Sequence, residues 1–266
     1  MEMNPYAPPV YDLAPDAPPP GDGSFIEGGR GVEAGRGYAW LTEGWAIVKV
    51  NFWSWFLVII LYGALAIGVS LVPVVGQVVF SAVTPLLTAG LLIGCRDIQE
   101  RRDFGVGHLF EGFKHAGGLL VIGLVHLAWS LVLGGVGLAV GGGGMFNAKP
   151  QFNPATGFDL AVLQPLLLFA VVSFVIGVPV TMATYYAPAL VALRGMSPID
   201  AMKNSLLGAS KNVLPFIVYC LATFLFAILA TLPCGLGVFV LAPVLIASVY
   251  AGYRDVFFMD PAPPSR

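Results

Sequence analysis

Six apolar segments, each about as long as a bilayer is thick, take up most of this sequence and leave few folds open to it. They run over Phe52–Val72, Gln77–Cys95, Leu119–Val140, Leu160–Ala192, Val213–Leu232 and a last stretch after Gly237 that ends at Gly252. A helix that crosses the hydrocarbon core needs about 20 such residues, and it pairs its own backbone groups where water is absent. We therefore expect an all-α, polytopic membrane bundle of six transmembrane helices.

The composition supports this prediction. Hydrophobic residues make up 57% of the chain and charged residues only 11%, whereas a soluble domain carries about 25% charged residues. Because so few charges cannot cover a surface that faces water, we expect the lipid bilayer to surround most of the protein as its partner. The net charge of −2 gives no basic field, and nucleic-acid binding is not expected.

The distribution of cations predicts how the chain is threaded. With the N-terminus in the cytoplasm, Lys149 is the one residue of the 13 Lys and Arg that falls outside. Cytoplasmic loops of membrane proteins carry the excess of Lys and Arg. We therefore predict a multi-pass membrane protein with both termini in the cytoplasm.

One stretch recurs near the end of the chain. Pro, Leu, Ala, Gly, Arg and Asp recur in register in 85–97 and 243–255. The predicted unit is a short interfacial helix, a span, an outside turn, a span that contains a proline, and a basic end. It occurs two to three times, in units of about 37–98, 107–194 and 197–255, of which the middle one is the most diverged. A two-span unit repeats without inversion, so we expect an axis along the membrane normal.

Each predicted unit begins with an amphipathic helix. These helices cover Tyr38–Lys49, His108–His115 and a segment that starts at the serine cap Ser197. Tryptophan and other apolar residues on one face suit the membrane interface. Asn51 and Asn212 stand at the same place, directly before a span, in the first and third units.

Three domains follow from these patterns. Residues 1–36 are expected to be a disordered, Pro-rich cytoplasmic tail, residues 37–258 the membrane domain, and residues 259–266 a short cytoplasmic tail. The segments Pro5-x-x-Pro8 and Pro15-x-x-Pro18 could dock on an aromatic groove of a protein partner. The alternative is a plain solvated tail.

Prolines and glycines mark the predicted kinks and close helix contacts. The second span of each unit contains a proline at comparable depth: Pro85, Pro179 and Pro243. The third span carries small residues four apart, in the pairs Ser130/Gly134 and Gly137/Gly141. Small residues at this spacing let two helix backbones approach closely.

His126 is the one histidine inside a predicted span. An ionisable group in hydrocarbon is a functional candidate because it is costly to place there. A proton relay is one interpretation. The other is a neutral imidazole that hydrogen-bonds a neighbouring helix near Ser130 or Gln164.

The second candidates are the Arg-Asp pairs that end two spans: Arg96 with Asp97 and Arg254 with Asp255. Arginine suits a helix C-terminus, but aspartate does not, because the helix dipole is negative there. We expect either cross-pairing, Arg96 to Asp255 and Arg254 to Asp97, or two independent ends that reach the interface.

No enzymatic pattern is found. The chain lacks a Ser-His-Asp set in a plausible frame, a His-x-x-x-His pair, a paired cysteine motif and a phosphate-binding loop. We therefore expect no catalytic activity, no metal and no cofactor.

The motifs resemble those of a known family. Trp40-Leu41-x-x-Gly44-Trp45 and Leu109-Phe110-x-Gly112-Phe113 are similar to the pattern of an uncharacterised proteobacterial family of multi-pass inner-membrane proteins, as are Gly90-x-x-x-Gly94-Cys95-Arg96 and Ala201-Met202-Lys203-x-Ser205. The resemblance covers about 37–258. It implies residence in the bacterial inner (cytoplasmic) membrane and supplies no activity and no catalytic residues.

Two functions are compatible with these patterns. The first is a membrane-organising or accessory bundle without transport, which the weakly polar spans and the tail favour. The second is a transporter or channel for a small or lipid-like solute, which the repeat and the proline-bearing helices favour. A lipid-modifying enzyme is a distant third. A wet central cavity on which the prolines and His126 converge would favour transport, and a packed centre the first function.

Overall fold

The computed structural model describes residues 24–72, 75–140, 152–153, 157–158, 163–233 and 235–259. Helices occupy every predicted span, so the predicted all-α membrane bundle is confirmed. Within these described residues, six helices are long and apolar enough to cross a membrane. The elements are α1 Arg36–Val50, α2 Phe52–Ser70, α3 Val75–Gln99, η1 Val106–His115, α4 Ala116–Val140, β1 Phe152–Asn153, β2 Gly157–Phe158, α6 Leu163–Tyr185, α7 Ala187–Arg194, α8 Pro198–Ser210, α9 Val213–Thr231 and α10 Val238–Phe257.

Two bounds differ from the sequence prediction. The long segment Leu160–Ala192 is not one continuous helix, because it divides at Tyr186 into α6 and α7. The predicted interfacial segment His108–His115 forms the 3-10 helix η1, which runs directly into α4. Between α4 and α6, β1 and β2 pair antiparallel over two residues each.

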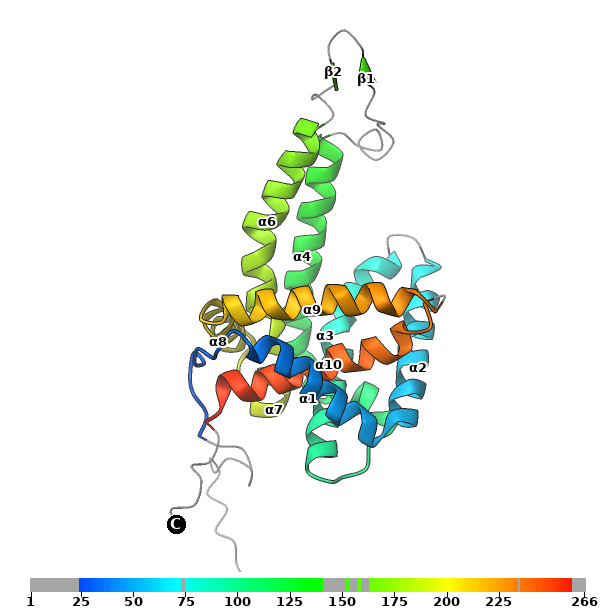
Figure 1. The fold of residues 1–266 in the computed structure, drawn as a ribbon, viewed down its shortest axis with the longest axis vertical. Coiled ribbons are helices and arrows are strands. Elements are labelled where there is room, and N and C mark those ends of the chain that lie inside the picture. The colour runs from blue at the N-terminus through cyan, green and yellow to red at the C-terminus, as the bar shows by residue number, and fades with distance from the viewer. Residues whose placement is uncertain are drawn as a thin grey trace, which may run out of the picture.

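The hairpins α2–α3, α4–α6 and α9–α10 do not run parallel. In Figure 1, α4 and α6 stand upright and extend beyond the rest of the molecule, while α9 lies across them. The chain changes direction between a short helix and the next span at Asn51 (φ −130°, ψ 47°) and Asn212 (φ −121°, ψ 31°). The two asparagines therefore share one backbone conformation as well as one place in their units. The predicted symmetry axis itself stays a prediction.

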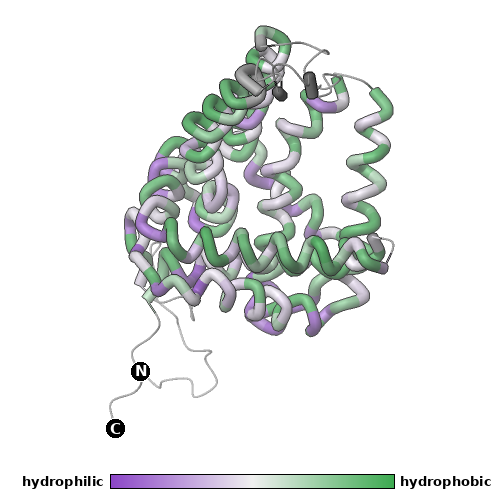
Figure 2. Tube along the Cα trace, turned by 45° about the horizontal axis from the view of Figure 1, so that its top comes forward, coloured by the Kyte–Doolittle hydropathy of each residue, from purple (hydrophilic) through white to green (hydrophobic). Residues whose placement is uncertain are grey.

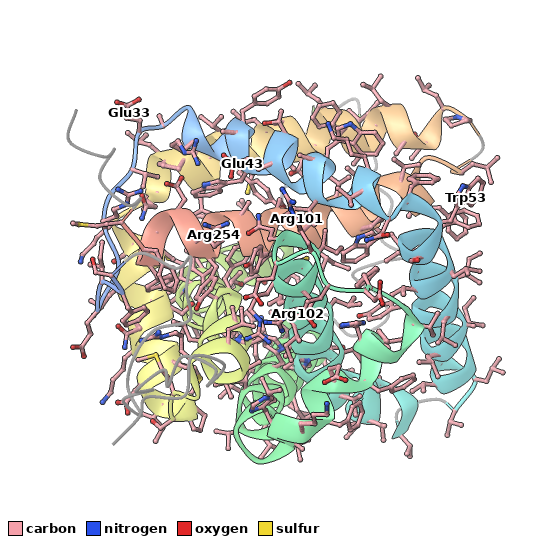
Figure 3. All side chains as sticks on the ribbon, turned by 90° about the horizontal axis from the view of Figure 1, so that it is seen from below. Glu33, Glu43, Trp53, Arg101, Arg102 and Arg254 are labelled. Atoms are coloured by element: carbon pink, nitrogen blue, oxygen red, sulfur yellow. The ribbon has the colours of Figure 1, made fainter. Side chains whose placement is uncertain are left out.

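Apolar side chains cover the outside of the spans. Only 17% of the most apolar window is buried in α2 and in α9, against 56% in α3 and 44% in α10. Figure 2 shows α9 as an almost continuous hydrophobic rod on the surface. Seen from below in Figure 3, Arg101, Arg102, Arg254 and Glu43 gather on one face. The molecule thus has an apolar periphery and one face rich in charges, which we call the charged face.

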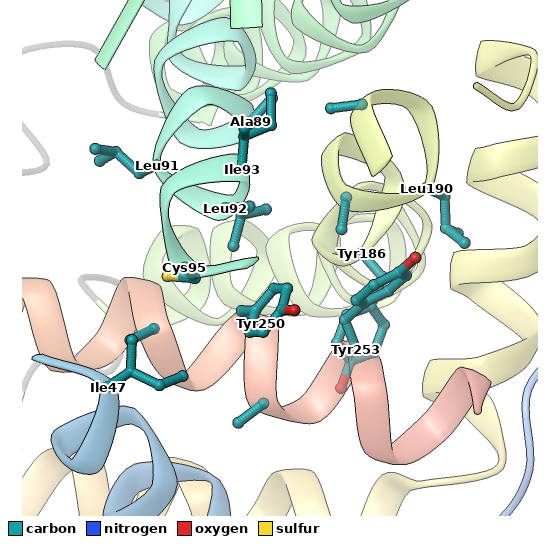
Figure 4. Close-up of a cluster of buried hydrophobic side chains, with 14 of the residues drawn as sticks. Ile47, Ala89, Leu91, Leu92, Ile93, Cys95, Tyr186, Leu190, Tyr250 and Tyr253 are labelled. Carbon is teal, nitrogen blue, oxygen red and sulfur yellow. The ribbon is translucent and has the colours of Figure 1, made fainter. Parts of the chain in front are cut away.

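The core lies where α1, α3, α7 and α10 meet. Figure 4 shows Ile47 of α1, Leu92 of α3 and Tyr250 of α10 gathered with Tyr186, which directly precedes α7. Every residue of α7 from Ala187 to Ala192 is buried. The centre of the molecule is thus filled with side chains.

A strap of residues 24–35 corrects the predicted disordered tail. Phe25 forms a β-bridge with Phe258, and the Arg30 N–H donates to the Val256 carbonyl at 2.8 Å. The Asn212 amide donates to the Arg30 carbonyl at 2.7 Å and accepts from the Val32 N–H at 2.8 Å. Composition missed the strap because its stability comes from these distant backbone partners. The remaining part of the predicted tail, including both Pro-x-x-Pro segments, lies outside the described residues, as does 260–266.

Candidate functional site: three helix joints

Each short helix packs along a proline-bearing helix of a different unit. We call these contacts joint 1 (α1 on α10), joint 2 (η1 on α3) and joint 3 (α8 on α6). The order is cyclic, since each unit places its short helix on the second span of the preceding unit, and the first unit packs on the third. The joints therefore link all three hairpins into a closed ring.

The same small-residue contact lies at the centre of joints 1 and 2. A Cβ added at Gly44 would lie 2.7 Å from the Val244 carbonyl oxygen and 2.8 Å from the Ser248 nitrogen. In joint 2, a Cβ added at Gly112 would collide with the Leu86 carbonyl. Because these carbonyls directly follow Pro243 and Pro85, the two joints use matching positions of their helices.

Joint 3 has a serine at this place, and the serine bends the helix. Ser205 Oγ accepts from the Tyr186 N–H at 3.0 Å and donates to the Met182 carbonyl at 2.7 Å. Those two backbone groups would bond each other in an unbroken helix, so the hydroxyl is inserted between them. A side chain inserted into the helical hydrogen-bond ladder is a known cause of kinks. This insertion explains why the predicted long span divides at Tyr186.

The prolines do not occupy three equivalent positions. Pro85 and Pro243 are buried at joints 2 and 1, each one residue before the carbonyl at the crossing. In joint 3 that place belongs to Thr181, and Pro179 lies two residues earlier with an exposed side chain. Relative to the crossing, Pro179 is therefore displaced by about half a helical turn from the position of the other two prolines, and their depth in the membrane stays a prediction.

Asp255 is the most densely bonded charged group of the described residues. Its side chain, only 8% exposed, accepts from Arg30 at 3.1 Å, from Arg36 at 2.6 Å and from the Trp40 indole at 2.9 Å. Arg36 also reaches Glu43 at 2.8 Å. Burial opposes the charge of Arg36, but the Asp255 hydrogen bond and charge, with help from Glu43, outweigh it and raise the Arg36 pKa. The network joins the strap and α1 to the end of α10.

Asp97 stands at the corresponding end of α3. It lies 3.2 Å from His108 Nε2 and 3.1 Å from Arg102 Nη1. His108 precedes Gly112 by four residues, as Trp40 precedes Gly44, so a ring nitrogen meets an aspartate at the same place in joints 1 and 2. In joint 3 the residue four before Ser205 is Ala201, which carries no such donor.

The cross-pairing hypothesis is wrong. Arg96 Nε lies 3.6 Å from Asp97 of its own helix and 3.9 Å from Glu100, which directly follows that helix. Arg254 donates to the Gln99 side chain rather than to Asp97. Each aspartate is held instead by a ring nitrogen from a short helix of another unit, Asp97 by His108 and Asp255 by Trp40.

His126 lies on α4, partly buried and apart from the joints. Among the side chains that the structure describes, none hydrogen-bonds its ring, and Ser130 donates instead to the His126 backbone carbonyl at 2.9 Å. The Gln164 side chain lies outside that set. Nothing described therefore extends His126 into a proton relay.

The glycines of α4 do not bring α4 and α6 together. A Cβ added at Gly134 would meet no atom within 4 Å, and one at Gly137 would lie 3.8 Å from the Phe169 ring. The close backbone approach on α4 is made by Gly123 against Ala82 of α3. Gly141 lies outside the described residues.

Sequence reasoning missed most members of the joints. Trp40, His108 and Ser205 were seen as parts of short helices and Arg36 as the end of the tail, not as partners of distant spans. The signal that could have found them is the shared pattern x-Leu-x-Glu-Gly, with Trp40 or His108 at its first position.

Among the described residues, no group of three His, Cys, Asp or Glu is placed to hold a metal.

The comparisons agree with this architecture. The chain is 27% identical over 265 residues to a probable inner membrane protein of Burkholderia thailandensis, an alignment that covers 88% of this chain and 95% of the relative. No protein-family model matches the chain, and no solved structure matches it. The predicted resemblance to uncharacterised inner-membrane proteins is confirmed. The chain is a multi-pass protein of the inner membrane, and the name of its relative states a location and no activity.

Proposed function

We propose that this protein is a non-enzymatic accessory bundle that organises other components of the inner membrane, with both termini in the cytoplasm. The observation that supports the proposal is the filled centre where α1, α3, α7 and α10 meet. A conduit for solutes needs space there, and the largest side chains of the core occupy it. The ion pairs of Asp255 and Asp97 stabilise joints 1 and 2, and we assign them no role in conducting a solute.

A transporter is the second candidate, and the placement of its expected parts weakens it. Pro85 and Pro243 lie in two joints, while Pro179 is exposed and His126 is on α4. These residues do not converge on one cavity. The positive-inside distribution of charge supports the proposed orientation, in which the charged face and the strap lie in the cytoplasm.

Reconstitution tests this function. The full chain is placed in vesicles of phosphatidylethanolamine and phosphatidylglycerol, and proton and potassium fluxes are recorded beside those of protein-free vesicles. The packed centre predicts equal fluxes. In parallel, the full chain and a variant without residues 1–23 are isolated with their surrounding lipid, and co-purifying proteins are identified. Fluxes clearly above the protein-free level, or no partner retained by the full chain, would count against an accessory role.

A further inference from the structure

A groove of about 490 Å³ opens between α1, α9 and α10. Its walls are apolar side chains, among them Leu41, Trp45, Leu229, Val240, Leu241 and Val244. The lining residues Tyr38 and Thr42 lie on the same face of α1 and add two hydroxyls. None of the described lining residues is charged at neutral pH, so the groove is an apolar site with two hydroxyls along the wall formed by α1.

The α9–α10 hairpin bounds one end of the groove. There Gly237 packs against Ala230, and the chain turns back into α10. On α9 the lining residues all lie between Phe226 and Ala230. The groove is therefore a short site beside the hairpin, not a continuous channel along the molecule.

The size of the groove argues against a protein helix as its occupant. An α-helix is at least about 10 Å across and rises 5.4 Å per turn. A volume of about 490 Å³ therefore accommodates little more than one turn of helix. The same volume lies well within the range of small-molecule sites. A long, thin and apolar molecule fits, and the bilayer around α9 and α10 supplies one in the form of lipid tails.

We propose that this groove binds one acyl chain of a membrane phospholipid as a resident lipid. The chain lies along α9 and α10 beneath α1, with its ester end toward the first turn of α1. There the Tyr38 hydroxyl is the donor for an ester carbonyl, since Thr42 Oγ1 already donates to the Ala39 carbonyl at 2.9 Å. The site goes beyond the accessory function and needs only membrane residence.

Photolabelling of the full-length protein tests the site. The protein is reconstituted in vesicles of phosphatidylethanolamine and phosphatidylglycerol, with a trace of phosphatidylethanolamine that carries a diazirine within one acyl chain. After illumination, labelled peptides are mapped by mass spectrometry. We expect the peptides of α1 and α10 that line the groove to be labelled more strongly than the outward faces of α2 and α4.

Two matched variants separate the groove from the general lipid surface. Leu229→Trp fills the groove, whereas Leu225→Trp adds the same bulk one turn away, at a residue that is 61% exposed and does not line it. Labelling of groove peptides should fall about tenfold in Leu229→Trp, equivalent to 1.4 kcal/mol of binding, and stay unchanged in Leu225→Trp. Tyr38→Phe should also lower the labelling of groove peptides, but by less than Leu229→Trp does.

Three outcomes would overturn the site. They are equal labelling of α1, α2 and α4, equal labelling of the two tryptophan variants, and chemical crosslinks between α9 helices of two copies in place of lipid labelling. If Leu229→Trp fails to fold, as judged by its melting temperature, Val240→Phe on the opposite wall replaces it. Flux through vesicles tests the accessory function alone, so the two proposals fail separately.

Discussion

The Trp40 indole donates to the Asp255 carboxylate at 2.9 Å, across 215 positions of the chain. The contact joins the first short helix to the last span and thereby closes the ring of joints. Its counterpart is His108 beside Asp97 in joint 2. An aspartate at a helix C-terminus opposes the helix dipole, and these ring nitrogens supply the stabilisation that makes the position tolerable.

Asp255→Ala should destabilise the protein by about 2–3 kcal/mol, because hydrogen bonds to a buried charged group are worth about that much. The loss leaves Arg30, Arg36 and Trp40 without their shared acceptor. The measurement is the melting temperature in mild detergent. Glu43→Gln is the control, because Glu43 is 44% exposed and its pair with Arg36 contributes little. Equal melting temperatures for the two variants would contradict the role of Asp255.

Ser205→Ala should cost about 1–3 kcal/mol, since it removes the hydroxyl that bridges two buried backbone groups. The Tyr186 N–H and the Met182 carbonyl would lose their partner unless the helix straightens. Ser210→Ala is the control: the exposed Ser210 bonds only its own helix. Thermal unfolding compares the two. A Ser205→Ala protein as stable as Ser210→Ala would show that the kink does not depend on the inserted serine.

Gly112→Ala and Gly117→Ala should change stability in opposite directions. The new methyl at Gly112 would collide with the Leu86 carbonyl, whereas nothing lies within 4 Å of the one at Gly117. Forcing an added methyl into a close-packed contact typically costs about 1–3 kcal/mol. At an open helical site, alanine in place of glycine gains up to about 1 kcal/mol. Denaturant titration measures both, and stabilisation by Gly112→Ala would refute the close contact in joint 2.

The sequence predicted the helices well because membrane spans depend on local composition. The length and apolarity of 213–232, for example, suffice to place α9 whatever it packs on. The joints depend on pairs such as Trp40 with Asp255, which lie far apart in sequence and look ordinary one at a time. Asp255 was suspected only because an acid is unfavourable at a helix end.

The break at Tyr186 and the strap were missed for a related reason. Pro188 follows Tyr186 closely, but a proline can also be tolerated inside a membrane helix, so it did not fix the break. The deciding group is the Ser205 hydroxyl on another helix. The strap was included in the Pro-rich tail, yet its Gly28 and Gly29 adopt positive φ (70° and 66°), a conformation that glycine adopts without strain.

Asn212→Ala should release the strap without unfolding the spans. The buried Asn212 amide bonds Arg30 and Val32 of the strap as well as the Gly208 carbonyl. Asn51→Ala is the matched control, because Asn51 stands at the same kind of bend and its side chain makes no capping bond. Limited trypsin digestion at Arg30 should speed up in Asn212→Ala only. Equal digestion rates for both variants would show that the strap is held by other contacts.

The orientation of the chain is tested by fusion to alkaline phosphatase, which is active only outside the cytoplasm. A fusion after residue 143 should be active and a fusion after Arg102 inactive, since Arg101 and Arg102 belong to the charged face and Lys149 is the lone cation of the predicted outside loops. Replacing Arg101 and Arg102 with glutamine should weaken the preference rather than reverse it, because the other cations still hold the charged face inside. A fluorescent-protein fusion at each site, bright only in the cytoplasm, provides the complementary control. The reverse activity pattern would invert the proposed topology and place the Asp255 network outside the cytoplasm.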